Sequence, residues 1–89
     1  MKMLVKYHRD KHSRPIGVLV AINIGESFRI GWSLCCKKDV FNKKRAKEIA
    51  IGRAQYYTIE DVEKSCPQTL RKAFAEMCKR ACKYYKTAT

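Results

Sequence analysis

The sequence predicts an α+β domain of two layers, in which a three-stranded antiparallel meander is packed on one face by two helices in the order β-β-β-α-α. Residues 1–35 alternate between apolar and polar positions with the period of strands, whereas residues 39–86 repeat their apolar positions with the period of helices. A short turn containing glycine separates two of the alternating runs, as in a hairpin. We expect a single domain, 1–89, because a chain of 89 residues builds only one modest core.

Three strands are expected in the N-terminal half. Residues 1–7 alternate apolar with mostly basic side chains, and residues 8–15 form a polar loop that ends in a proline. Residues 16–24 carry valines and isoleucines at alternate positions, and residues 28–35 carry aromatic and aliphatic side chains in the same way. A three-residue turn, 25–27, is expected to join these runs. The sheet would then have one apolar face, opposed by a face of small and polar side chains.

The first main helix is expected at residues 39–57. Its apolar stripe consists of alanines, an isoleucine and a tyrosine at helical spacing, and both Asp39 and Asn42 are candidate N-caps. Gly52 interrupts this pattern and costs about 1 kcal/mol relative to alanine. The glycine therefore indicates either a close packing contact or a helix that frays at this point.

The second main helix is expected to run to about Lys86. Ser65 and Gln68 have the spacing of a capping box, and a proline stands between them where its missing N–H does no harm. Before this helix, Thr58 has the pattern of a further helix start, which an acidic turn follows.

Charge is the strongest compositional feature of the chain. Twenty Lys and Arg residues against eight Asp and Glu residues give a formal net charge of +12. The basic residues concentrate in segments 2–14, 37–53 and 71–86, whereas segment 54–70 is acidic. Because repulsion between like charges lowers stability, such an excess indicates a polyanionic partner, the alternative being a basic surface that only confers solubility.

A nucleic-acid-binding surface follows from the arrangement of these cations. Four lysines of the last helix recur at i, i+7, i+11 and i+14, which forms a row suited to phosphates. Arginines add bidentate phosphate contacts, and tyrosines among basic residues can stack on unpaired bases or close the core. The candidate binding residues are Arg9, Arg14, Lys43, Lys44, Arg45, Lys47, Arg53, Lys72, Lys79, Lys83, Tyr84 and Lys86. Helix-turn-helix spacing is absent and the first half of the chain is rich in strands, which together favour RNA over DNA.

Other chemistries have weaker support. The chain has no GxSxG, Walker A or HExxH motif, so we expect neither enzymatic activity nor a cofactor. The His8/His12 and Cys78/Cys82 pairs have spacings compatible with metal ligation, but no CxxC motif accompanies them and we expect no bound metal. Five cysteines without an export signal indicate free thiols in a cytoplasmic protein. No segment is apolar and long enough to cross a membrane.

The segment 31–54, GWSLCCKKDVFNKKRAKEIAIGRA, resembles a pattern met in small accessory proteins of tailed bacteriophages, in which a strand end precedes K-D-x-F-N-K-K and then I-A-x-G-R-A. Many such proteins act on host defences or host enzymes by binding. Size and basic charge are similar to those of the phage inhibitors of toxin–antitoxin defence systems such as ToxIN, which include small RNA-binding proteins. The resemblance implies an anti-defence role that depends on binding, and it assigns no individual site residue.

Three further possibilities remain open. The basic helices would also suit an inhibitor that docks on an acidic surface of a host protein, or a DNA-binding regulator. A homodimer is conceivable, since an edge strand at residues 1–7 can pair with a second copy of itself.

Overall fold

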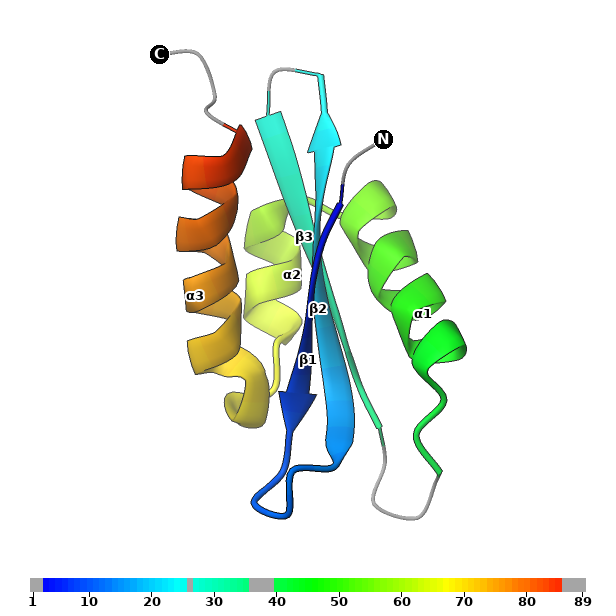
Figure 1. The fold of residues 1–89 in the computed structure, drawn as a ribbon. Helices are drawn as coiled ribbons and strands as arrows, with labels where there is room; N and C mark the ends of the chain where they lie inside the picture. The colour runs from blue at the N-terminus through cyan, green and yellow to red at the C-terminus, as the bar shows by residue number, and fades with distance from the viewer. Residues whose placement is uncertain (1–2, 26, 36–39, 86–89) are drawn as a thin grey trace.

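The computed structural model describes residues 3–25, 27–35 and 40–85. Three strands, β1 (Met3–Arg9), β2 (Pro15–Ile24) and β3 (Ser27–Leu34), are followed by three helices, α1 (Lys43–Tyr56), α2 (Ile59–Ser65) and α3 (Gln68–Tyr85). The strands form one antiparallel sheet in the order β1-β2-β3 (Figure 1). The α+β class and the meander are therefore confirmed. The structure has three helices where two main helices were expected, because the segment after Thr58 forms a full helix, α2.

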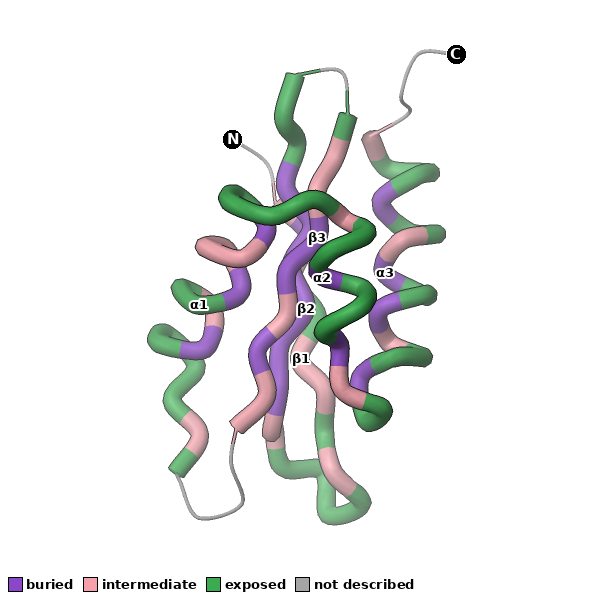
Figure 2. The backbone as a smooth tube through the Cα atoms, turned by 180° about the vertical axis from the view of Figure 1, so that it is seen from behind, coloured by how far each residue is buried: buried purple, intermediate pink, exposed green. Residues whose placement is uncertain are grey.

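The helices lie on both faces of the sheet and make three layers. Helix α1 covers one face, and α2 and α3 cover the other (Figures 1 and 2). Two separate clusters of buried side chains result, one between α1 and the sheet and one between the sheet and the α2–α3 pair. The expected two-layer arrangement, with both helices on a single apolar face, is wrong.

The length of the hairpin turn explains this error. Ile24 pairs with Ser27, so two residues connect β2 to β3 instead of the expected three, and Gly25 adopts a left-handed conformation with φ of 62°. A shift of one residue turns every side chain of a strand to the opposite face. Ile22 is consequently paired with Arg29, and Ala21 with Ile30. The apolar rows of β2 and β3 thus lie on opposite faces of the sheet.

Strand β2 supplies apolar side chains to both faces. Val18, Val20 and Ile22 pack toward α1. Leu19 and Ala21 pack toward α3. All five are at most 3% exposed, as expected for a central strand covered on both sides.

Helix α1 approaches the sheet closely because the contact consists of small residues. Ala46, Ala50 and Ala54 are its buried residues. A Cβ atom added to Gly31 of β3 would overlap the carbonyl oxygen of Ala50 and would lie 2.8 Å from the backbone nitrogen of Ala54. Gly52 has no such neighbour, and the helix continues past it to Tyr56. Neither explanation expected for Gly52 therefore holds.

The helix caps agree in part with the sequence pattern. The amide of Arg45 donates to the Asn42 side chain at 3.0 Å, and the amide of Asp61 donates to the Thr58 hydroxyl at 3.2 Å. Asp39, the other candidate N-cap, lies outside the described residues. Ser65 is the last residue of α2, and its hydroxyl donates to the carbonyl of Val62, so it does not form the expected capping box with Gln68.

Candidate nucleic-acid interface

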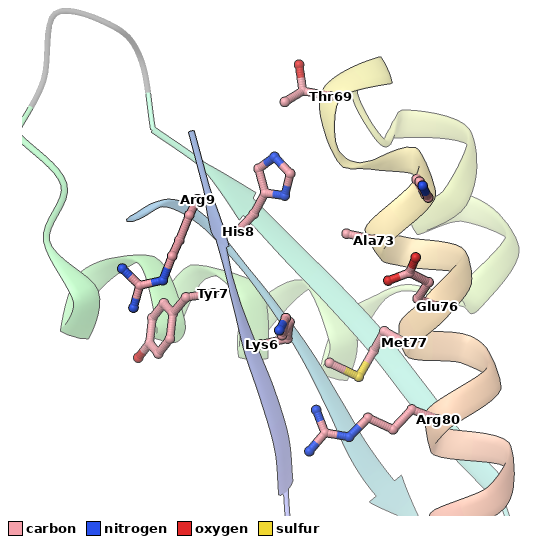
Figure 3. Close-up of a pocket in the computed structure, with 10 residues that line it drawn as sticks. Lys6, Tyr7, His8, Arg9, Thr69, Ala73, Glu76, Met77 and Arg80 are labelled. Atoms are coloured by element: carbon pink, nitrogen blue, oxygen red, sulfur yellow. The ribbon is translucent and has the colours of Figure 1, made fainter. Parts of the chain in front are cut away.

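The surface that concentrates cations is centred on β1, an edge strand of the sheet. A groove with a cavity volume of about 580 Å³ separates β1 from α3 (Figure 3). The groove is lined from β1 by Lys6, Tyr7, His8 and Arg9 and from α3 by Thr69, Lys72, Ala73, Glu76, Met77 and Arg80. It exists because α3 packs mainly over β2 and β3, which leaves the outer strand only partly covered.

On the β1 side of the groove, alternate residues of the strand point toward α3. Leu4, Lys6 and His8 pair with Ala21, Leu19 and Gly17 and share the sheet face that α3 covers. Leu4 is buried under α3, whereas Lys6 is exposed. The imidazole of His8 points toward α3 (Figure 3).

On the α3 side of the groove, charged residues recur at each turn of the helix. Lys72, Glu76 and Arg80 succeed one another at intervals of four residues and are all exposed. The Glu76 carboxylate and the Arg80 guanidinium both project from α3 toward β1 (Figure 3). Ala73 and Met77 lie among them and give the groove an apolar surface. The result is a channel with charged walls and an apolar base.

Cations also flank β1 on the α1 side of the sheet. The ammonium group of Lys43 lies 5.3 Å from the centre of the Tyr7 ring, which also makes an edge contact with Phe41. Lys47 follows Lys43 by one turn of the helix, so it lies on the same flank. The open edge of the sheet thus has lysines on both sides.

The β1–β2 loop adds further basic residues and is held by an acidic one. The Asp10 carboxylate accepts hydrogen bonds from the amides of His12 at 2.8 Å and Arg14 at 3.0 Å. These bonds, the Arg14 amide first, lower the pKa of Asp10 below its usual value. The Arg9 guanidinium donates to the Ser13 carbonyl at 2.9 Å, which fixes this side chain at the end of the strand.

The predicted binding residues divide between several surfaces. Arg9 and Lys72 line the groove, and Lys43 and Lys47 lie across β1 from it. The others are more dispersed: Lys79 and Lys83 are exposed on α3, Lys44 on α1 and Arg14 in the loop, while Arg45 lies in a second cavity beside β3. Tyr84 is half exposed and packs edge-on against Tyr85. Lys86 lies outside the described residues.

Arg53 lies at the other edge of the sheet, beside β3. Its guanidinium lies 4.2 Å from the Trp32 ring centre and donates to the Trp32 carbonyl at 2.8 Å. Nearby, Arg29 donates to the carbonyl of Tyr57 at 3.3 Å. These contacts cover part of the β3 edge, whereas no such contact is found at the β1 edge among the described residues.

Sequence reasoning did not identify Lys6, His8, Glu76 and Arg80 as parts of the site. Lys6 was visible as a basic position in the alternation of the first strand, and Arg80 as the residue one turn after Glu76. These residues meet in one groove because α3 covers β1 only partly. The sequence does not reveal this tertiary arrangement.

Within the described residues, the cations around β1 form no direct ion pairs. Among the residues that the structure describes, no Lys or Arg side chain forms an ion pair with a carboxylate. The acidic residues Glu60, Asp61 and Glu63 belong to α2, which packs near β3 and not near β1. A polyanion at the β1 edge would therefore meet positive groups that form no ion pair with a described carboxylate.

The described residues also bear on metal ligation, thiol reactivity and membrane insertion. No group of three or more His, Cys, Asp or Glu residues there is placed to hold a metal ion. Burial raises the pKa of the Cys66 and Cys78 thiols, which lowers the thiolate fraction at neutral pH. Among the described helices, none has the length and apolar character needed to span a bilayer.

Fold and surface together define a small α+β domain with a basic groove at one edge of its sheet. Comparison with protein-family models, curated proteins and solved structures found no match for this chain.

Proposed function

We propose that the protein binds single-stranded RNA without catalysing a reaction, and that the strand lies along β1 in the groove beside α3. The observation that carries the proposal is the convergence of Lys6, Lys72 and Arg80 on an apolar groove in which no cation is paired among the described residues. Phosphates would contact the basic walls, and bases would pack on Ala73 and Met77. The resemblance of segment 31–54 to phage accessory proteins supports a role in neutralising a host defence nuclease through bound RNA.

The geometry favours a single strand over a duplex. The groove is bounded by a strand on one side and a helix on the other and receives side chains from both. Unpaired bases can enter such a groove and stack there, whereas a duplex presents its bases edge-on within its own grooves. Binding of this kind tolerates many sequences and weakens steeply with salt.

Charge reversal in the groove tests the proposal. The double variant Lys72→Glu/Arg80→Glu is expected to weaken binding of a fluorescent oligouridylate of about ten nucleotides by more than about tenfold, measured by anisotropy at low salt. Lys64→Glu/Arg71→Glu is the matched control, because it replaces one Lys and one Arg that are exposed and do not line the groove. The control should lose no more than about threefold through its lower net charge.

Two results would overturn the proposal. One is equal loss of affinity in the groove variant and the control, with unchanged thermal stability in both, because binding would then depend on net charge alone. The other is failure of the wild-type protein to bind any RNA or single-stranded DNA oligonucleotide at low salt. Tighter binding to DNA of the same sequence would favour the DNA-binding regulator instead.

A second candidate function rests on the open edge of β1. The Cys35 amide donates to the Ile16 carbonyl, and this bond shows which residues of each strand face which neighbouring strand. By the same alternation, the backbone N–H and C=O groups of Met3, Val5 and Tyr7 point away from β2. An acidic segment of a host protein could pair with this edge and place its carboxylates near Lys6 and Lys43. Protein purified after nuclease treatment that still captures a protein from host cells, and that shows no affinity for RNA, would favour this inhibitor.

A further inference from the structure

We infer that Glu76 makes the groove selective for guanine, so that the preferred ligand is a single strand that presents an unpaired guanine opposite this carboxylate. The inference rests on the proposed function and adds a base preference to it. A carboxylate among phosphate-binding cations repels the RNA backbone, so its presence in the groove requires a separate explanation.

The simplest explanation is that Glu76 forms ion pairs with basic residues of the same helix. Lys72 and Arg80 stand four residues before and after it, where ion pairs within a helix can form. Neither pair forms among the described residues, and the carboxylate projects toward β1 (Figure 3). Glu76 is therefore available as a hydrogen-bond acceptor within the groove.

The base edges differ in what they offer to such an acceptor. Guanine carries two adjacent donors on its Watson–Crick edge, N1–H and the N2 amino group, which match the two oxygens of one carboxylate. Adenine and cytosine each place an amino group beside an acceptor nitrogen, and uracil places one N–H between two carbonyl oxygens. Only guanine can therefore form a bidentate pair with Glu76 without bringing an acceptor toward the carboxylate.

The surroundings of Glu76 suit a base held in this way. Ala73 and Met77 provide an apolar surface one turn before and one residue after it. The His8 imidazole projects from the opposite wall and can stack on the ring (Figure 3). Lys72 and Arg80 flank the carboxylate along α3, where they can contact the phosphates on either side of the base.

Four oligonucleotides and three proteins test the inference. The probes are an oligouridylate of about ten nucleotides and the same strand with one central guanosine, inosine or adenosine. The wild-type protein should bind the guanosine strand about tenfold more tightly than the uridine and adenosine strands. Inosine lacks the N2 amino group and should lose most of this preference.

The variants separate base reading from net charge. Glu76→Gln should bind the oligouridylate more tightly than wild type, because a negative charge leaves the groove, and should show no more than about twofold preference for guanosine. Glu48→Gln is the matched control, since Glu48 is exposed on α1, which packs on the opposite face of the sheet. It makes the same change in net charge and should retain the full preference.

The outcomes distinguish this inference from the proposed function. Equal affinity of the wild-type protein for all four strands, with strong binding to each, would overturn the reading of guanine by Glu76 and leave RNA binding in place. A guanosine preference that persists in Glu76→Gln would also overturn it. Absence of binding to every strand would instead refute the proposed function.

Discussion

Two glycines with opposite surroundings illustrate how single residues control this fold. Gly31 lies where α1 touches β3, and any side chain there would meet the α1 backbone at Ala50 and Ala54. Gly52 lies within α1 with no atom near the position of an added Cβ. The first glycine is needed for close packing between layers, and the second only lowers the stability of its helix.

The two positions should respond to alanine in opposite directions. Gly52→Ala is expected to raise the free energy of unfolding by about 1 kcal/mol, because alanine favours the helix and restricts the unfolded chain. Gly31→Ala should lower it by about 2–3 kcal/mol, because backbone atoms cannot move aside as a flexible side chain can. Urea denaturation of both variants measures the two values, and a change of the same sign in both would contradict the contacts described at these positions.

Single residues were also where the sequence was most informative. The capping roles of Asn42 and Thr58 were predicted and confirmed, because a cap depends on residues three positions apart in the chain. The capping box at Ser65 was wrong because a preceding helix, α2, continued to include that residue. A local pattern is reliable when no neighbouring element competes for the same residue.

At the scale of elements, strand β2 explains why the predicted two-layer arrangement was wrong. Its uninterrupted apolar run at residues 16–22 is typical of a strand covered on both faces, yet alternation with the flanking polar residues favoured one apolar face. The turn to β3 could be drawn with two residues or with three, and the number decides the face on which Trp32 and its neighbours lie. The strands and main helices were therefore predictable, and their layering was not.

Helix α1 also closes one edge of the sheet through Arg53. Arg53→Ala removes the stacking on Trp32 and the hydrogen bond to the Trp32 carbonyl, so the free energy of unfolding should fall by about 2 kcal/mol. The variant should also elute earlier than wild type in size-exclusion chromatography as concentration rises, because the β3 edge becomes able to pair.

Arg45→Ala provides the control for this prediction. Arg45 is exposed and on the same helix, and its replacement should change the free energy of unfolding by less than about 0.5 kcal/mol. Equal effects of the two substitutions would show that Arg53 contributes only a positive charge.

At the scale of the whole molecule, the net positive charge opposes folding and would favour the RNA binding proposed above. The net charge of +12 is carried by a chain with a radius of gyration of 12.6 Å. No Lys or Arg is paired with a carboxylate in the described part of the chain, so solvent and counterions carry much of the screening of these cations. Salt should therefore act on stability and on RNA affinity in opposite senses.

Salt titration measures both effects on one protein. Raising sodium chloride from about 20 mM to about 500 mM should raise the thermal midpoint by several degrees, because the Debye length falls below the spacing of the charges. Over the same range the logarithm of RNA affinity should fall linearly, with a slope of about −0.7 per phosphate contacted. Thermal stability that falls with salt would indicate attractive charge pairs, contrary to the described contacts.

The candidate site was foreseen only as a property of the whole chain. Composition predicted a polyanionic partner, and the helical pattern placed lysines such as Lys72 on an exposed face. The groove itself depends on where α3 crosses the sheet, which no local pattern in the sequence encodes. Residues from β1 and from α3 therefore became neighbours only through tertiary packing.

The asymmetry between the two edges of the sheet also limits stoichiometry. Among the described residues, Arg53 and the α1–α2 connection lie against the β3 edge, so an incoming β-strand is expected to pair along β1. Two molecules that pair in this way would use the open edge of each, whereas a filament of sheets needs two open edges on every molecule. Pairing through the sheets is therefore expected to stop at a dimer.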